Sequence, residues 1–405
     1  MGIAVRKSLV FAVVAIAFSG CADGDKLPAG AVRRDSAGVM IVRLADLSAD
    51  PFPAWSSTPL YSTTAHDTIL LWGTATAVFA ADSSLIIGSG PDLISLSPDG
   101  LTLHRLGRQG DGPGEYRIIL RVGNAEGGTL FVAELSGRIT HLTDGGRVLG
   151  IIPRLQLASS EREVDVIALL DSIRVVATWW QQRPNRGDIV GLPSGDFERD
   201  PVPLLVYDST GRKIDSLGLW RGMERALLSP GGRIPVLFAR FAAYDARGST
   251  IAIGPTDSVD VSVFDGTRLT TRFTASTPRR PPTDADRAAS SHAILLECDS
   301  PELVAALASA PQVAAMPVVG ALVVDNQRNI WVGDYVTPAE HERRWTVYSP
   351  AGQPIGTMLL PAAPEALVPG RSEILDVYGD RLALLRVSEV GELSIEVRRF
   401  SAAPH

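Results

Sequence analysis

Residues 78–117 read VFAADSSLIIGSGPDLISLSPDGLTLHRLGRQGDGPGEYR and contain one complete repeating unit. Four short apolar segments follow one another, with Asp82-Ser83 in the first turn and Pro98-Asp99-Gly100 in the third. The fourth segment, residues 101–106, ends in a glycine-rich loop. Short alternating strands with turn residues between them are typical of antiparallel hairpins. The stretch therefore predicts a four-stranded antiparallel sheet.

The composition of the chain is that of a turn-rich β protein. Its 405 residues include 38 glycines and 28 prolines, and only 6% are aromatic. A chain of this length can bury a substantial core. The formal net charge of −7 argues against nucleic acid as a partner, because a polyanion would be repelled.

The N-terminal residues predict export and a lipid attachment site. Arg6 and Lys7 precede an apolar segment, residues 8–18, that is too short to span a bilayer as a helix. It runs into Phe18-Ser19-Gly20-Cys21, which resembles the lipobox of bacterial lipoproteins. The resemblance implies that residues 1–20 are a signal peptide and that Cys21 is lipidated. We expect residues 21–34 to form a flexible tether to the membrane.

The residue after the cysteine bears on localisation. Ala22 stands where an aspartate would retain a lipoprotein at the inner membrane, so the resemblance implies the outer membrane, facing the periplasm. The alternative is an ordinary signal peptide and a secreted or soluble periplasmic protein. In either case we expect a monomer.

A turn followed by a short apolar strand recurs six times along the chain. The copies begin at Asp82, Glu126, Asp171, Asp245, Asp325 and Gly379. A second marker, a polar turn with glycine before another strand, lies around Gly100, Gly145, Gly211, Gly266 and Gly352. The sixth copy lacks this marker, and residues 35–44 supply a matching turn and strand. We therefore expect residues 39–44 to pair with residues 393–400 and close a ring without a free edge.

These markers predict an all-β, six-bladed β-propeller over residues 35–405. Residues 107–116 match the GxxGxGPGEF signature of NHL-like and TolB-like six-bladed propellers, and residues 35–39 and 325–332 also carry the resemblance. The chain is similar in particular to exported bacterial proteins of this kind. The glycine-rich loop lacks the Lys-Ser/Thr of a phosphate-binding P-loop, so its glycines are expected to allow a tight turn. A capping sequence at residues 283–286 predicts a small helical insertion over about residues 283–316.

The long segments are all expected on one face of such a propeller. In a four-stranded meander the first-to-second and third-to-fourth turns share one face, and all other connections share the opposite face. The long connections all belong to the second group: residues 108–117, 153–164, 181–203, 219–238, 274–317, 333–344 and 361–372. Long loops on one rim usually build a recognition surface. We therefore expect a single functional face.

The candidate ligand-binding residues combine aromatic faces with amide and guanidinium donors, which suit a peptide, a glycan or an anionic small molecule. They are Trp179, Trp180, Gln182, Arg183, Arg186, Trp220, Arg221, Arg117 and Arg240. The structural alternative is that the two neighbouring tryptophans alternate between core and surface and that the polar residues are merely solvated.

These observations favour a non-catalytic binding or scaffold protein with a peptide, glycan or protein partner. No catalytic residue, metal ligand or cofactor is predicted. The alternative is a lactonase-like hydrolase or lyase with a metal site at the propeller channel. The residues expected near the channel, Thr74, Arg117, Asp165, Arg240 and Glu373, mix two acids with two arginines and suit a hard cation poorly. A structural envelope component would instead have a flat rim with short loops.

Overall fold

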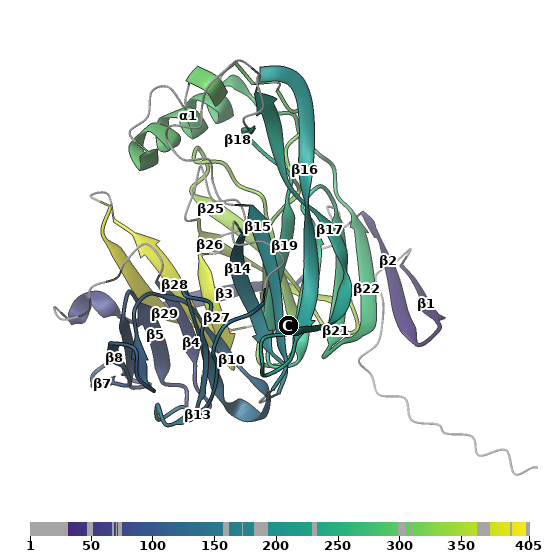
Figure 1. The fold of residues 1–405 in the computed structure, drawn as a ribbon. Coiled ribbons are helices and arrows are strands. Elements are labelled where there is room, and N and C mark those ends of the chain that lie inside the picture. The colour runs from purple at the N-terminus through teal and green to yellow at the C-terminus, as the bar shows by residue number, and fades with distance from the viewer. Residues whose placement is uncertain are drawn as a thin grey trace, which may run out of the picture.

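The described strands of the computed structural model form sheets of six, four, five, eight, four and two strands, built mainly from antiparallel runs of four, which confirms the all-β prediction (Figure 1). The structure describes residues 31–46, 52–66, 69, 71, 75–156, 162–171, 173–181, 193–228, 233–298, 305–307, 309–310, 312–362, 373–388 and 391–401. Apart from one N-terminal strand in the last unit, each strand of a unit pairs with the next one along the chain. Local hairpins therefore build most of the fold.

Six such units can be followed through the described residues, and we number them in chain order. Unit 1 consists of β4 (Thr76–Phe79), β5 (Leu85–Ser89), β6 (Asp92–Leu96) and β7 (Leu103–Arg105). Unit 2 consists of β10 (Ile119–Asn124), β11 (Leu130–Glu134), β12 (Ile139–Leu142) and β13 (Val148–Ile152). Unit 3 consists of β14 (Arg162–Leu169), β15 (Val175–Gln181), β16 (Pro193–Tyr207) and β17 (Lys213–Leu228), with β18 (Arg233–Pro235) added beside β17.

The remaining three units follow the same order. Unit 4 consists of β19 (Ala242–Arg247), β20 (Thr250–Pro255), β21 (Val259–Asp265) and β22 (Arg268–Ser276). Unit 5 consists of β23 (Val319–Val324), β24 (Ile330–Asp334), β25 (Glu342–Tyr348) and β26 (Pro354–Pro361). Unit 6 consists of β27 (Ile374–Tyr378), β28 (Arg381–Val387) and β29 (Leu393–Ser401), and β3 (Ala54–Ser62) completes it. Outside the units lie β1 (Val32–Ser36), β2 (Val39–Asp46), the paired β8 (Arg108–Gln109) and β9 (Glu115–Tyr116), and the 3-10 helices η1 (Thr63–Ala65) and η2 (Glu126–Gly128).

Aspartates fold the short turns that the repeat analysis singled out. The Oδ1 atom of Asp82 accepts a hydrogen bond from the backbone N–H of Ser84 at 2.9 Å. Asp208 Oδ1 accepts from the N–H of Thr210 at the same distance. A carboxylate that binds the backbone two residues ahead mimics a backbone turn. The recurring Asp therefore marks turns because of its own hydrogen bond.

The first strands of the units contact one another in a cycle. β4 contacts β10, β10 contacts β14, β14 contacts β19, β19 contacts β23, β23 contacts β27, and β27 contacts β4. Each neighbouring pair of units also shares a buried hydrophobic cluster. The last unit is thus packed against the first, and apolar burial between neighbours stabilises every junction.

The strand that completes unit 6 is not the one predicted. Residues 39–44 were expected beside residues 393–400, but β2 pairs in parallel with β22 of unit 4. β3 pairs with β29 instead, from Ser62 opposite Glu396 to Ser56 opposite Ser401. An N-terminal strand therefore does complete the last unit, as expected, although the predicted segment was wrong.

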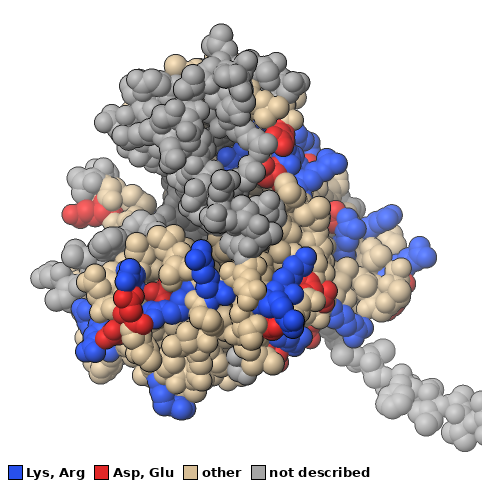
Figure 2. Space-filling model, in the orientation of Figure 1, with Lys and Arg blue, Asp and Glu red and all other residues tan. Residues whose placement is uncertain are grey.

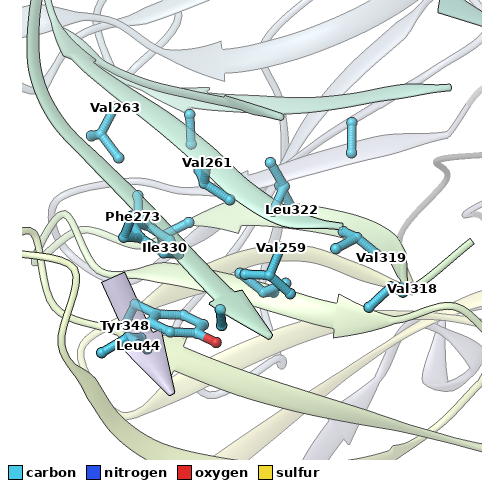
Figure 3. Packing of buried hydrophobic residues seen from close by; sticks show 14 of the residues in the cluster. Leu44, Val259, Val261, Val263, Phe273, Val318, Val319, Leu322, Ile330 and Tyr348 are labelled. Carbon is cyan, nitrogen blue, oxygen red and sulfur yellow. The ribbon is translucent and has the colours of Figure 1, made fainter. Parts of the chain in front are cut away.

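β2 has a different role, as a cover for the junction between units 4 and 5. Its alternate side chains Val42 and Leu44 are buried in the hydrophobic cluster that those units share. Figure 3 shows Leu44 beside Tyr348, near Phe273, in this cluster. Burying this apolar face fixes β2 at the outer edge of unit 4, with β1 beyond it (Figure 1).

β16 and β17 are far longer than predicted. Residues 193–203 and 219–228 were expected in loops, but they extend the β16–β17 hairpin beyond unit 3 (Figure 1). The two strands pair from Pro193 opposite Leu228 to Tyr207 opposite Lys213, so that they satisfy each other's backbone groups outside the body of the unit.

The extended hairpin supports the helical insertion. Helix α1 (Asp284–Cys298) begins directly after Thr283, as the capping sequence predicted. Ile294 of α1 and Leu307 pack against Ala226 of β17 and Phe238. No helix in the described residues is long and apolar enough to cross a membrane. We call the side of the molecule with the hairpin extension, α1 and the unit-to-unit links the loop face, and the opposite side the turn face.

Candidate functional site

Two of the predicted ligand-binding residues lie on the extended part of β17. The indole of Trp220 is half buried and packs edge-on against Phe264 of unit 4, with ring centroids 6.1 Å apart. The side chain of Arg221 is exposed, and no described residue forms an ion pair with it. Trp220 thus fills the junction between units 3 and 4, while the Arg221 guanidinium faces solvent.

The other predicted residues of unit 3 are only partly described. Trp179 and Trp180 lie in β15, where the backbone pairs with β14. Gln182, Arg183 and Arg186 lie outside the described residues. Ligand binding by these five residues stays a prediction.

The predicted residue Arg240 connects unit 4 to the extended hairpin. Its guanidinium binds the carboxylate of Glu224 on β17, with Nη2–Oε1 at 2.5 Å and Nε–Oε2 at 3.0 Å. The Glu224 side chain is only 2% exposed. Burial alone would raise the pKa of Glu224, but the hydrogen bonds and the charge of Arg240 lower it below its usual value.

Three guanidinium groups approach one carboxylate oxygen at the loop face. The Oδ2 atom of Asp257, between β20 and β21, lies 3.4 Å from Nη2 of Arg279 and 3.9 Å from Nη1 of both Arg199 and Arg240. The two longer distances exceed those of a direct hydrogen bond, so Asp257 is a shared counter-ion. We call Arg199, Arg221, Arg240 and Arg279 the arginine cluster.

Positive charge is in excess within this cluster. Burial is the main cause that lowers the pKa of Arg199, and the like charges of Arg240 and Arg221 lower it further, while Asp257 opposes them. The four arginines face two carboxylates, Glu224 and Asp257, which gives a formal local charge of four minus two, or +2. An acidic chain therefore carries a local cationic site on its loop face.

The predicted residue Arg117 lies apart from this cluster, in the loop before unit 2. Both of its bonds to Asp111 are 2.7 Å long. The two side chains are each 70% exposed, so solvent screens the pair. The structure therefore does not bring Arg117 together with Arg240.

The glycine-rich loop before unit 2 is held by hydrogen bonds within the protein. Oε2 of Glu115 accepts from the N–H of Gly112 at 2.9 Å, and Oε1 accepts from Nε of Arg108 at the same distance. Arg138 of unit 2 donates to the backbone carbonyls of Asp111 and Glu115. These bonds give the GPGE sequence a structural role, in line with the tight turn expected for it.

A half-buried polar network crosses the centre of the cycle of first strands. Arg121 of β10 forms an ion pair with Asp245 of β19 at 2.7 Å. Asp245 also accepts from the N–H of Val324 in β23, at 2.8 Å. The predicted channel residue Asp165 of β14 accepts from the hydroxyl of Tyr244, also at 2.8 Å. Burial raises the pKa of Asp245, and Arg121 opposes this rise.

A second set of bonds lies nearer to the turn face. Arg247, at the end of β19, donates to the carboxylate of Asp376 in β27 and to the carbonyl of Phe79 in β4, the latter at 3.3 Å. Asp376 in turn accepts from the N–H of Phe79 at 2.6 Å. The Arg247 guanidinium also lies over the ring of Tyr378, 5.3 Å from its centroid. One side chain of unit 4 therefore joins units 6 and 1.

The acids near the centre do not fit a divalent cation. Glu373 is fully buried, accepts from Nε1 of Trp345 at 2.8 Å and lies 3.0 Å from Nη1 of Arg343. Asp165 and Asp245 are likewise occupied by Tyr244 and Arg121. Among the residues that the structure describes, no three His, Cys, Asp or Glu side chains are grouped to hold a metal. Thr74, the remaining predicted channel residue, lies outside the described residues.

Sequence reasoning missed four members of the site at the loop face, namely Arg199, Glu224, Asp257 and Arg279. They lie in separate segments of the chain, and each is an ordinary charged residue. Only the pairing of β16 with β17 and the packing of unit 3 against unit 4 bring them together. No local signal in the sequence marks them.

Neither the family models nor the curated proteins gave a match. Among solved structures, the chain is similar to a "Putative exported protein" of Bacteroides fragilis NCTC 9343, with a TM-score of 0.43 and 12% identity over 89% of this chain and 99% of that one. It is also similar to a chain of a mitotic checkpoint complex, with a TM-score of 0.38 and 12% identity over 87% and 98% of the two chains.

Proposed function

We propose that the chain is a six-bladed β-propeller of the NHL-like and TolB-like kind, in which each four-stranded unit is a blade. The cycle of contacts between first strands supports this architecture, as does a shared hydrophobic cluster at each of the six junctions. β3 would be the strand that closes the ring.

We further propose that the protein is exported and anchored by a lipid on Cys21, at the outer membrane and facing the periplasm. The leader sequence and the lipobox-like residues 18–21 support this localisation. Mass spectrometry of the mature N-terminal peptide should find acylated Cys21 as the first residue. An unmodified peptide that begins elsewhere would instead indicate a secreted or soluble periplasmic protein.

The function that the site supports best is non-catalytic binding of a peptide, glycan or protein partner at the loop face. The observation that carries this proposal is the partly exposed arginine cluster beside the extended β16–β17 hairpin. The opposite face consists of short turns whose polar groups bond to their own backbone. The lactonase-like alternative has less support, because the described acids at the centre are paired within the protein.

Site-specific photo-crosslinking in the cell envelope tests this proposal. A photo-reactive amino acid would replace Arg221 on the loop face or Arg147 in the β12–β13 turn, both of which are exposed. We expect a discrete adduct from position 221 and none from position 147. Equal adducts from both positions, or adducts from position 147 alone, would contradict a functional loop face.

A further inference from the structure

We infer that the arginine cluster is a binding site for a dianionic oxyanion group, the chemistry shared by a dicarboxylate and a phosphate. This inference rests on the proposed binding function and names the chemistry that its loop face recognises. It stands on the convergence of the guanidinium groups, their partial exposure and the excess of positive charge.

The charge balance sets the charge of the ligand. Arg199, Arg221, Arg240 and Arg279 carry four positive charges, and Glu224 and Asp257 return two negative ones. The neighbouring pair of Arg225 and Asp200 on the same hairpin, 2.9 Å apart, is neutral and leaves this sum unchanged. A dianion would cancel the remaining +2, whereas a monoanion would cancel only half of it.

The hydrogen-bond donors are partly free to receive such a ligand. Arg199 is fixed in place because its Nε donates to the carbonyl of Gly222 at 2.9 Å and its Nη2 to that of Arg221 at 3.0 Å. Its Nη1 lies 3.9 Å from the carboxylate of Asp257, a distance that is too long for a direct hydrogen bond. A ligand oxygen placed closer to Nη1 than Asp257 could accept a direct hydrogen bond from it.

The members of the cluster differ in exposure in a way that suits ligand entry. The Arg279 side chain is 40% exposed, that of Arg240 34% and that of Arg199 13%. Arg221 is exposed and lies beside Arg199, whose Nη2 donates to the Arg221 backbone carbonyl at 3.0 Å. A ligand can therefore reach the more buried Arg199 past the more exposed arginines at the rim. Guanidinium forks bind carboxylates and phosphates with paired hydrogen bonds.

Calorimetric titration of the full chain in detergent tests the inference. The probes are succinate and inorganic phosphate, compared with acetate and chloride at one ionic strength, because salt screens weak ion pairs. We expect saturable binding of at least one dianion and no saturable binding of the monoanions. Binding of succinate alone would assign a dicarboxylate ligand, and binding of phosphate alone a phosphate group.

Two variants locate the site and one serves as a matched control. Arg221→Gln and Arg279→Gln should each weaken dianion binding about tenfold, the effect of losing one charge-assisted hydrogen bond. Arg147→Gln removes another exposed arginine, from the turn face, and should leave binding unchanged. The denaturation midpoint of Arg221→Gln should match the wild type, since Arg221 has no ion-pair partner in the described residues. Arg279→Gln should lower it slightly, because Nε of Arg279 donates to the carbonyl of Asp257 at 2.7 Å.

Two results would overturn the inference. The first is the absence of saturable dianion binding by the wild-type chain, and the second is unchanged affinity in both loop-face variants. Neither result would contradict the proposed binding function, because a neutral partner would still give a crosslink from position 221. If dianions bind but position 221 gives no crosslink, the proposal of a macromolecular partner would be wrong, whereas the anion site would stand.

Discussion

At the scale of single residues, Asp286 shows how one carboxylate fixes the insertion on the loop face. Its Oδ2 accepts from the N–H and hydroxyl of Thr283 at 2.9 and 2.7 Å, and the N–H of Asp286 donates back to that hydroxyl at 3.1 Å. Thr337 and Arg280 bind the same carboxylate at 2.9 and 3.0 Å. This reciprocal cap starts α1 and ties it to unit 5.

Acid should therefore loosen α1 before it unfolds the rest of the chain. Burial would raise the pKa of Asp286, but the bonds from Thr283 and Thr337 and the charge of Arg280 lower it to about 2. Because this value lies below the ordinary 3.8, the carboxylate stabilises the fold fully above about pH 3.8 and loses this effect as the pH falls through about 2. Amide hydrogen exchange of residues 284–294, corrected for the intrinsic pH dependence, should accelerate over that range.

Two variants separate this cap from a general effect of acid. Asp286→Ala should destabilise α1 by about 1–2 kcal/mol at neutral pH and remove the pH dependence. Asp284→Ala removes an exposed acid from the same helical turn and should cost at most about 1 kcal/mol, with the pH dependence intact. A pH response that persists in Asp286→Ala would assign it to another group.

At the scale of elements, the two glycines at matching third-to-fourth turns differ in what surrounds them. Gly211 has φ +77°, and an added Cβ would lie 2.0 Å from the carbonyl oxygen of Arg154. Gly266 has φ +60°, and nothing lies within 4 Å of the same position. Both positions have a left-handed backbone conformation, but only at Gly211 would a side chain also collide with its surroundings.

Gly211→Ala should therefore destabilise the chain much more than Gly266→Ala. We expect about 1 kcal/mol for the backbone strain at Gly266 and at least about 3 kcal/mol at Gly211, where the backbone of the unit 2 to unit 3 link must also move. Chemical denaturation of the two variants measures the difference. Equal losses of stability in the two variants would show that the segment around Arg154 can move to make room for the added methyl group.

β3 shows why the closing strand was not found in the sequence. Its residues AWSSTPLYS contain a proline and three serines, and they lack the alternating apolar residues that predict a strand. The ladder between β3 and β29 has an irregularity between Val397 and Arg398, and Pro59 pairs with Arg398 there. The strand therefore accommodates a proline, a residue that usually argues against a strand. β2 shows clear alternation, because it covers a hydrophobic junction, and was taken for the closing strand.

The same reasoning explains which parts of the site were predicted. Repeated turns are local signals, so the four-stranded units and the start of α1 followed from the sequence. Arg221 and Arg240 were identified as candidates from their type and place. Arg199 and Asp257 were not, because their proximity depends on the pairing of β16 with β17 and on packing between two units. Tertiary contact of this kind leaves no periodic pattern.

Trp55 of β3 should be the main contact that holds the closing strand. Its ring stacks on Phe400 with centroids 5.5 Å apart and meets Trp331 edge-on at 5.6 Å. Trp55→Ala should destabilise the chain by about 3 kcal/mol, the cost of removing a large packed aromatic side chain. Leu60→Ala, in the same strand but 38% exposed, should cost less than about 1 kcal/mol. Thermal denaturation with both variants checks this, and an equal loss would argue against a special role of Trp55.

At the scale of the whole molecule, the units are joined in two ways. Neighbouring units share hydrophobic clusters, which resist separation but do not fix the angle around the ring. The bond between Arg247 and Asp376 spans units 4 and 6, which are not neighbours. Because hydrogen bonds are directional, the bonds of Arg247 to Asp376 and to the carbonyl of Phe79 limit how far these units can move apart. On the surface in Figure 2, by contrast, acidic and basic side chains are interspersed, and exposed pairs of this kind contribute little.

The ion pair of Arg247 and Asp376 should therefore stabilise the fold, and a double variant can show how much of this effect is due to charge. The side chains of Arg247 and Asp376 are 11% and 6% exposed, and burial raises the pKa of Asp376 while Arg247 opposes this rise. Arg247→Gln leaves a buried carboxylate without its counter-ion, and we expect a loss of about 3–5 kcal/mol in the free energy of unfolding. The further change Asp376→Asn removes the buried charge but keeps an oxygen that accepts from the N–H of Phe79. Urea denaturation of the double variant should recover most of the loss. If the double variant is as unstable as Arg247→Gln, the contacts of Arg247 with the carbonyl of Phe79 and the ring of Tyr378, rather than its charge, hold units 6 and 1 together.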